Sequence, residues 1–330
     1  MALIQPDDTG LHCPAGPFHI DPWRPARTAV ITHAHADHAR AGSDQFYAAE
    51  PCVPLLQRRL GTAARVHGVP SGESIRIGGA RISFHPAGHI LGSAQVRIEA
   101  GGEVWVVTGD YKRDADPTCA AFEPVRCDVL ITEATFALPI YRWPDPAVVA
   151  KEIHDWWQAN RAHGRTSVLF CYALGKAQRV LAELQRHTSE PVRVHGAVEP
   201  LTALYRRAGI EMLPTRLLEE RRRGDDHAGD LIIAPPGAGG TPWMKRFADA
   251  STGFCSGWMQ VRGNRRRRGY DRGFVLSDHA DWPGLIETIR QSGAKRVLAT
   301  HGHSDALVQY LVERNIDAAA LSTTYAGEAE

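Results

Sequence analysis

The residues best suited to chemistry form one short segment, Thr32-His-Ala-His-Ala-Asp-His38, which directly follows an apolar run. His33 and His35 are two positions apart, so in an extended chain their imidazoles point to the same side. Asp37 and His38 follow where we expect the chain to turn into a helix. Burying imidazoles and carboxylates without partners costs several kcal/mol, and a bound metal ion removes that cost. The segment therefore predicts a metal site.

Further ligands must come from distant parts of the chain, because a segment this short cannot complete two metal sites. Candidates directly follow predicted strands, where α/β proteins often place functional side chains. They are His89 in Ala87–Ser93, Asp110 in Val107–Tyr111 and His301 in Ala299–His303. Each of them alone could equally be a capping or solvent-exposed residue. Aspartate is the candidate that can bridge two cations, since its two oxygens can bind separate ions. Zinc suits the histidines, and manganese also accepts imidazole and carboxylate ligands.

Short strand-like runs separated by turns fill the first part of the chain. We expect strands at 28–32, 81–85, 95–99, 104–108 and 129–132. From Asp145, an expected helix cap, the pattern changes to strands that alternate with helices. The helices are expected at 145–160, 176–186 and 201–208, and the strands at 167–172, 191–195 and 230–234. Such alternation is typical of a parallel sheet covered by helices.

The tail repeats this alternation, with a strand at 273–277, a helix at 282–292, a strand at 296–300 and a helix at 305–315. A chain of 330 residues favours two domains, or one domain with a large insertion. With 43% hydrophobic and 23% charged residues, its composition is that of a globular protein and excludes disorder.

The sequence also indicates the cellular compartment in which the protein is expected. The apolar runs are of strand length and fall short of the roughly 18 residues of a membrane-spanning helix, so no membrane partner is expected. The first ten residues contain two aspartates and lack the apolar segment of a secretory signal. Six cysteines without CxxC spacing indicate reduced thiols. Together these features predict a cytoplasmic protein.

Charge gives a local signal rather than a global one. The net charge is only +1, which does not by itself indicate a nucleic-acid binder. Short basic runs nevertheless occur between residues 200 and 270, and the longest consists of Arg265, Arg266, Arg267 and Arg268. This run could contact phosphates or lie in a solvated loop.

The order of the motifs resembles that of a known fold. The segments HAHADH, GHILGS and TGDYKRD follow one another as in the metallo-β-lactamase fold, and Asp21 in FHID matches that fold's first acidic motif. Glu133 in ITEAT, His279 in SDHAD and His301 in THGH resemble the three additional motifs of the β-CASP nucleases. Longer segments, such as HPAGHILGSAQVRIE and YALGKAQRVLAELQ, are similar to the bacterial DNA-ligase-associated exonucleases.

The resemblance implies a fold and a function. It implies a metallo-β-lactamase αββα sandwich with an inserted β-CASP α/β domain: residues 1–144 form the first part of the sandwich, 145–268 the insert and 269–330 the last part. It implies a two-metal exonuclease that cleaves single-stranded DNA, with the 5′ end as the expected start, in DNA repair. A DNA ligase and a helicase of the same pathway are then expected partners.

The resemblance also assigns roles to residues. His33, His35 and His89 would hold one metal ion, and Asp37, His38 and His301 would hold the second. Asp110 would bridge the two ions. Asp21 would lie behind the ligands and orient an imidazole. Asp37, Glu133 and His279 form the expected catalytic set, whereas His85 and His303 match no ligand motif.

Two metal ions a few Å apart suit phosphodiester hydrolysis, because they lower the pKa of a shared water and neutralise charge at phosphorus. The leaving alkoxide then needs a proton, which a histidine outside the metal shell can supply. His279 is the candidate, with Glu133 holding its other ring nitrogen and keeping the imidazole cationic. In the insert, Tyr172 and Lys176 are candidates for contacts to bases and phosphates, although Lys176 could also be a solvated charge.

Three alternatives share parts of this signature. An RNA-processing endo- or exoribonuclease would use the same machinery, and His301 is the residue type that RNA-processing relatives have in the third additional motif. A small-molecule metallo-hydrolase would share HAHADH but would not need Glu133, His279 or the insert. A non-catalytic clamp with structural zinc is disfavoured, since structural zinc sites are usually closed by four ligands.

Overall fold

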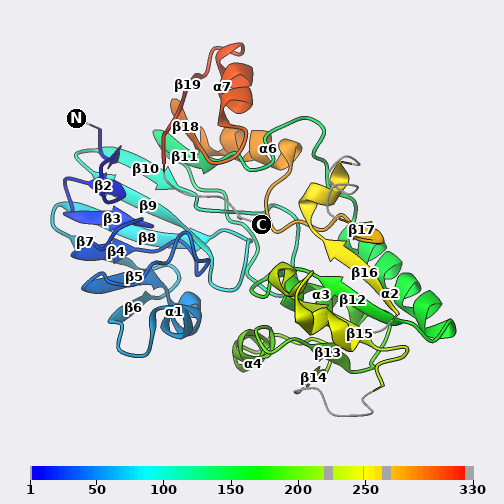
Figure 1. Cartoon of the computed structure of the whole chain (residues 1–330). Helices are drawn as coiled ribbons and strands as arrows, with labels where there is room; N and C mark the ends of the chain where they lie inside the picture. The colour runs from blue at the N-terminus through cyan, green and yellow to red at the C-terminus, as the bar shows by residue number, and fades with distance from the viewer. Residues whose placement is uncertain (1, 219–225, 248, 262–268, 324–330) are drawn as a thin grey trace. The chain divides into compact units, whose positions relative to one another are not determined.

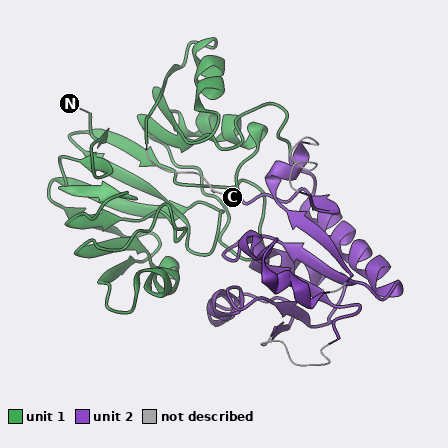
Figure 2. Cartoon of the chain, viewed as in Figure 1, with its two compact units in different colours: residues 1–142, 279–329 green, residues 143–278, 330 purple. Residues whose placement is uncertain are grey.

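The computed structural model describes residues 2–218, 226–247, 249–261 and 269–323. The chain divides into two compact units (Figure 2). Unit 1 comprises residues 1–142 and 279–329, and unit 2 comprises residues 143–278. The expected insert, 145–268, falls within the range of unit 2. The chain returns to unit 1 at His279, later than the expected return at residue 269, because β17 (Arg272–Phe274) still pairs with β16 (Ala250–Cys255) in the sheet of unit 2.

Unit 1 contains two sheets (Figure 1). The first has the strand order β1 (Gln5–Pro6), β2 (Leu11–Cys13), β3 (Phe18–Ile20), β4 (Thr28–Val30), β5 (Gln45–Ala49) and β6 (Val66–Val69). The second has the order β19 (Asp317–Ala320), β18 (Arg296–Thr300), β11 (Val129–Glu133), β10 (Glu103–Val107), β9 (Ala94–Ala100), β8 (Ala80–Pro86) and β7 (Ser74–Ile77). The helices are η1 (Glu50–Cys52), α1 (Val53–Leu60), α6 (Trp282–Ser292) and α7 (Ser304–Val312).

The core of unit 1 lies on both faces of the second sheet. Phe18 from the first sheet and Trp105 from the second belong to one buried cluster, which fills the space between the two sheets. Val106, the next residue along β10, belongs to another cluster, with Leu285 of α6 and Leu307 of α7. Successive side chains of a strand point to opposite faces, so β10 contributes to both clusters. Helices α6 and α7 therefore cover the outer face of the second sheet.

Unit 2 is built on one parallel sheet, as the sequence predicts. Its strand order is β14 (Thr215–Leu217), β13 (Val192–Val194), β15 (Leu231–Ala234), β12 (Thr166–Phe170), β16 and β17, and every pairing in it is parallel. Helices α2 (Pro146–Ala162), α3 (Lys176–Leu184) and α4 (Glu199–Arg207) alternate with the strands. The short helices are η2 (Pro236–Ala238), η3 (Pro242–Arg246) and η4 (Gly257–Gln260).

Helix α2 shows how the sequence determines this packing. Its predicted cap is confirmed, because the Asp145 carboxylate accepts the Ala147 N–H at 2.8 Å and Pro146 occupies the first helical position. Trp156 on its buried face packs edge-to-face on Phe274 with the ring centroids 5.4 Å apart. Within the described ranges, neither α2 nor any other helix combines the length and apolar character needed to cross a membrane.

Several predicted elements are confirmed and others differ. Helix 282–292 and strand 296–300 form with the predicted bounds as α6 and β18. The helix expected after Asp37 is wrong: residues 36–38 form a turn, with one helix-type hydrogen bond from the Ala39 N–H to the His35 carbonyl at 2.9 Å. Gly42 follows with φ +107°, which turns the chain towards β5 and ends any helical continuation.

Candidate metal centre

The predicted ligands lie where strands of unit 1 end. His33, His35, Asp37 and His38 follow β4, His89 follows β8, Asp110 follows β10 and His301 follows β18. In the second sheet, β8 is antiparallel to β9, β9 is antiparallel to β10, and β10, β11 and β18 are parallel. The carboxyl ends of β8, β10, β11 and β18 therefore share one edge of the sheet. That common edge is what brings side chains from distant parts of the sequence together.

One group of ligand atoms comes from His33, His35, His89 and Asp110, and these atoms all lie within 4.8 Å of one another. The Nε2 atom of His89 is 3.0 Å from the Nδ1 atom of His35, and the Nε2 atom of His33 is 3.5 Å from the Asp110 Oδ2 atom. Two ligand atoms of a tetrahedral zinc ion lie about 3.3 Å apart, given bonds of about 2.0–2.1 Å. The spacing of this group therefore fits a single ion.

A second group contains His38, Asp110 and His301, also within 4.8 Å of one another. The His38 Nε2 atom is 3.5 Å from the Asp110 Oδ2 atom, and the His38 and His301 rings stack with their centroids 5.5 Å apart. The Asp37 Oδ2 atom lies 3.7 Å from the His38 Nε2 atom, although Asp37 is not a member of the group. Asp110 belongs to both groups, which is the position that a bridging carboxylate requires.

Two buried atoms in these groups test whether a metal fits. The Nε2 atom of His33 and the Oδ1 atom of Asp110 make no hydrogen bond within the described part of the chain. The side chains are 0% and 6% exposed, so water does not compensate for the missing partners. A buried polar atom without a partner costs about 1–3 kcal/mol. A divalent cation would satisfy both atoms, and the residues therefore fit a metal ion.

The electrostatics of the centre also suit metal binding. Burial, reinforced by His38, lowers the pKa of His33 well below its ordinary value, and burial lowers the pKa of His301 to about 4. Burial acts in the same direction on His38, but the Asp110 carboxylate outweighs it and raises the pKa of His38 well above its ordinary value. Burial would raise the pKa of Asp110, but the charge of His38 outweighs it and holds that pKa well below its ordinary value. Neutral imidazoles and an ionised carboxylate are the forms that bind metals, so the shifts of His33, His301 and Asp110 favour binding. His38 would instead have to release a proton when an ion binds.

Asp21 contacts Thr32 and the predicted ligand His38. Its Oδ1 atom accepts the Thr32 N–H at 2.8 Å, and its Oδ2 atom accepts from the Thr32 hydroxyl at 2.5 Å and from the His38 Nδ1 at 2.8 Å. Because Nδ1 of His38 is held in this way, Nε2 is the ring nitrogen that faces Asp110. Sequence reasoning missed the part played by Thr32, whose only signal was its place at the start of the histidine segment.

We expect the substitution Asp21→Asn to weaken metal binding by roughly 10- to 100-fold, the usual cost of losing a partner that orients a ligating histidine. The asparagine oxygen can still accept the Thr32 N–H, but the amide nitrogen cannot accept from His38. Zinc titration against a chromophoric chelator measures the effect. The matched control is Asp8→Ala, which removes an exposed carboxylate nearby in the sequence. Equal zinc affinity in Asp21→Asn and the parent would contradict the orienting role.

His279 and Glu133 form a buried pair in unit 1. The His279 Nδ1 atom is 2.9 Å from the Glu133 Oε2 atom, and the two side chains are 2% and 1% exposed. Glu133 ends β11, and its Oε1 atom accepts the Tyr111 N–H at 2.7 Å. Burial raises the pKa of Glu133 although His279 acts in the opposite direction. The His279 ring centroid lies 4.8 Å from that of His89, so the pair borders the histidine cluster.

Asp110, Glu133 and His279 also place ligand atoms within 4.8 Å of one another. The geometry is therefore compatible with two roles for His279, a proton donor beside the metals or an additional ligand. These two roles predict different behaviour of a His279 variant.

The candidate substrate contacts lie in unit 2. Lys176 is 1% exposed, and its Nζ atom is 2.8 Å from the Asp278 Oδ2 atom, so the alternative that Lys176 is a solvated charge is wrong. Arg179 joins the same ion-pair cluster and donates to the Ser277 carbonyl at 2.5 Å. Tyr172 is half-buried. The basic run of Arg265, Arg266, Arg267 and Arg268 lies outside the described residues.

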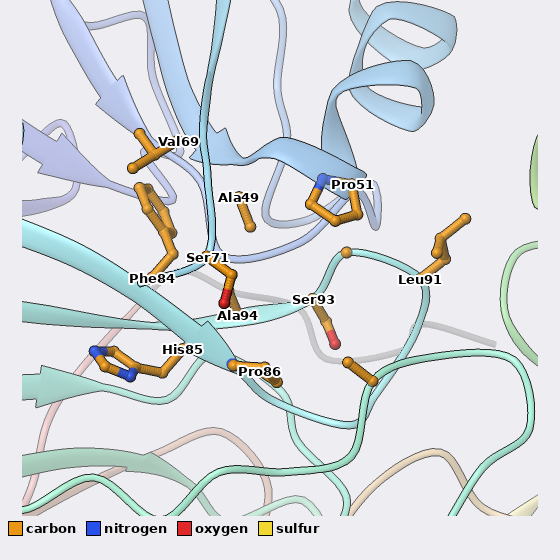
Figure 3. Close-up of a pocket in the computed structure, with 12 residues that line it drawn as sticks. Ala49, Pro51, Val69, Ser71, Phe84, His85, Pro86, Leu91, Ser93 and Ala94 are labelled. Carbon is orange, nitrogen blue, oxygen red and sulfur yellow. The ribbon is translucent and has the colours of Figure 1, made fainter. Parts of the chain in front are cut away.

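A pocket of about 190 Å³ lies beside the loop that carries His89 (Figure 3). Apolar side chains such as Val69, Phe84 and Leu91 form most of its wall, and Ser93 joins them. The Ser93 hydroxyl accepts the N–H groups of His89 and Ile90, both at 3.1 Å, and so shapes the loop. The lining residues include none of the predicted metal ligands.

Comparisons with known proteins place this geometry in context. No family model matches the chain. Over 318 residues it is 31% identical to a probable DNA ligase of Opitutus terrae, a match that covers 94% of this chain and 30% of that protein. It is 31% identical to the endoribonuclease YSH1 of Candida albicans over 38% of this chain and 14% of the relative. An RNase J-like protein of Methanocaldococcus jannaschii is 26% identical over 38% of this chain and 32% of the relative.

A solved structure shares the fold. The crystal structure of a protein of unknown function from Enterococcus faecalis V583 matches with a TM-score of 0.59 and 13% identity, covering 90% of this chain and 79% of that one. This chain spans only 30% of the length of the ligase relative and 14% of the Candida relative. The endoribonuclease and RNase J-like names among these relatives support the nuclease superfamily that the motifs of this chain indicate, whereas the name of the ligase relative does not itself name a nuclease.

Proposed function

We propose that this protein is a two-metal phosphodiesterase that hydrolyses single-stranded DNA from the 5′ end. We assign unit 1 to a metallo-β-lactamase αββα sandwich and unit 2 to its β-CASP insert. The observation that carries the proposal is the convergence of two ligand groups that share Asp110, with the His279–Glu133 pair beside them. Zinc is the favoured metal and manganese the alternative, because the ligand groups combine imidazoles with carboxylates.

The chain's own residues divide the chemistry between binding and proton transfer. The bound ions would supply an activated water and neutralise charge on the phosphate. His33, His35 and His89, together with Asp37, His38 and His301, would hold the ions, and Asp110 would lie between them. Glu133 fixes the Nδ1 atom of His279, so the other ring nitrogen is the one that can give a proton to the leaving oxygen.

The choice of DNA rests on the ligase relative. The probable DNA ligase matches 94% of this chain, whereas the endoribonucleases of Candida albicans and Neurospora crassa match 38% and 70% of it. Because the ligase relative carries a region similar to this whole chain, we propose that the protein works beside a DNA ligase, and with a helicase of the same pathway, in cytoplasmic DNA repair. Tyr172 remains a proposed contact to the strand, whereas Lys176 is not retained as one, because it is buried against Asp278.

A ribonuclease is the second candidate function. It is favoured by the names of the endoribonuclease and RNase J-like relatives and by the histidine at position 301. Both candidates use the same ligands and the same proton donor, so variants of the metal centre cannot separate them. Only a comparison of DNA and RNA as substrates can separate the two candidate functions.

A matched pair of substrates tests the choice. We expect single-stranded DNA labelled at its 5′ end to release its label as a very short product at the earliest times, and to be cleaved faster than RNA of the same sequence. A 3′-labelled strand should instead shorten progressively. Time courses resolved on denaturing gels measure both results, and the Asp110→Ala protein controls for contaminating nucleases. Cleavage of RNA at an equal or higher rate would overturn the DNA assignment, and early release of a 3′ label would overturn the polarity.

A further inference from the structure

Three potential ligands form a separate cluster at the start of unit 1. Asp7 follows β1, His12 lies in β2 and His19 lies in β3. The antiparallel register of β2 and β3 pairs His12 directly with His19, so their side chains lie side by side on the same face of the sheet. Their rings stack with centroids 4.7 Å apart and an interplanar angle of 21°. The ligand atoms of all three residues lie within 4.8 Å of one another, and none belongs to the other described ligand groups.

The distances between the ligand atoms of this cluster lie just below and just above the distance expected between two ligand atoms of one zinc ion. The Asp7 Oδ2 atom is 3.0 Å from the His19 Nε2 atom and 3.8 Å from the His12 Nδ1 atom. Ligand atoms around a tetrahedral zinc ion are about 3.3 Å apart, as follows from bonds of about 2.0–2.1 Å. A small movement of the side chains would therefore place all three atoms at bonding distance from one ion.

The carboxylate of the cluster is held in place before any metal binds. The N–H groups of Thr9 and Gly10 donate to the Asp7 Oδ1 atom at 2.7 and 2.9 Å. Because Oδ1 is used by the turn, Oδ2 is the oxygen that faces the two imidazoles. These hydrogen bonds and His19 also lower the pKa of Asp7 against the opposing effect of burial, which favours the ionised form that binds metals.

We propose that Asp7, His12 and His19 bind a divalent transition-metal ion, with zinc as the best match, at a site separate from the candidate metal centre. Three protein ligands leave the fourth position of a tetrahedral ion for water. The side chains of Asp7, His12 and His19 are 41%, 29% and 17% exposed, so water can reach that position. The ion would join the end of the two-residue edge strand β1 to β2 and β3 and so fasten the edge of the first sheet.

Metal counting on two variants tests this site. Asp7→Asn keeps an oxygen for the Thr9 and Gly10 N–H groups but replaces the metal-facing oxygen by an amide nitrogen. The double substitution His12→Ala with His19→Ala removes both imidazoles. After equilibrium dialysis at one fixed free zinc concentration, elemental analysis should find one zinc ion per chain fewer in the double variant than in the parent, and a reduced content in Asp7→Asn. Nuclease activity on DNA should be unchanged in both.

His67→Ala supplies the matched control, because His67 is an exposed histidine of β6 in the same sheet and belongs to none of the described ligand groups. Its zinc content should equal that of the parent. Near-UV circular dichroism of each variant establishes that the fold is retained, and Asp7→Asn provides the test should the double variant fail to fold. Equal zinc content in all the proteins would overturn the proposal and leave Asp7 and His19 as a hydrogen-bonded pair. Loss of more than one ion per chain would overturn the separateness of the site.

Discussion

Replacing Asp110 with alanine should abolish nuclease activity, lowering the rate by about four orders of magnitude or more, as expected when residues that act as one unit lose a member. Asp110 belongs to every described ligand group around the histidine cluster, and its Oδ2 atom lies 3.5 Å from both His33 and His38. Without this carboxylate, the buried imidazoles of both groups lose the negative charge between them. Metal content should therefore fall together with activity. His35→Ala should have the same effect on activity through the loss of a ligand from one group.

The measurement combines initial rates on labelled single-stranded DNA with elemental analysis of the purified proteins. His85→Ala is the matched control, because His85 lies in β8, the strand that precedes His89, yet hydrogen-bonds to Glu123 and belongs to none of the described ligand groups. It should retain both metal and activity. An active Asp110→Ala protein would contradict the two-metal assignment. So would a parent protein that contains no transition metal and whose nuclease activity is unchanged by a chelator.

His279→Ala should slow cleavage of DNA by roughly two to four orders of magnitude, the usual contribution of a positioned general acid. It should leave the metal content and the fold unchanged, because the two groups that hold the predicted metal ligands, the one with His33, His35 and His89 and the one with His38 and His301, do not include His279. Glu133→Gln should slow the reaction more mildly. The amide oxygen can accept from only one of the two groups that Glu133 serves, the His279 Nδ1 atom and the Tyr111 N–H, and the amide removes the negative charge that stabilises the cationic imidazole.

A second substrate separates proton donation from metal binding. A nitrophenyl phosphodiester has a leaving group that needs no proton, so His279→Ala should slow its cleavage far less than the cleavage of DNA. Rates on both substrates and the metal content of the same preparation are the required measurements. His303→Ala serves as the control, since His303 stacks near Tyr141 and is not a member of the described ligand groups. If His279→Ala loses a metal ion, or slows both substrates equally, then His279 is a ligand or a binding residue instead.

Much of the fold could be predicted from local sequence patterns. Helix α6 has the bounds that the sequence predicts. The Asp281 carboxylate accepts the Gly284 N–H at its start, and Gly293 follows its end with φ +63°. The parallel sheet of unit 2 follows from strands that alternate with helices. The strands β1, β2 and β3 could not be predicted. They contain only two or three residues, too few for a period of two to stand out.

The sequence alone determined which residue types are available for metal chemistry and where they stand relative to the predicted strands. It indicated His33 to His38 as a ligand segment, because burying so many imidazoles and carboxylates in a hydrophobic core without partners costs free energy. Only the tertiary structure decided that His89, Asp110 and His301 join this segment. Their meeting depends on which strands are neighbours and which run parallel, and those are long-range pairings that no local pattern encodes.

The same reason explains two further differences between sequence and structure. The cluster of Asp7, His12 and His19 depends on the register of β2 against β3, which two isolated histidines in the sequence do not reveal. Lys176 begins a helix, a position where a lysine is usually solvated, yet it is buried against Asp278, a residue far along the chain. A charge is buried only where tertiary packing provides its partner, so the sequence established the presence of the charge and the fold decided its environment.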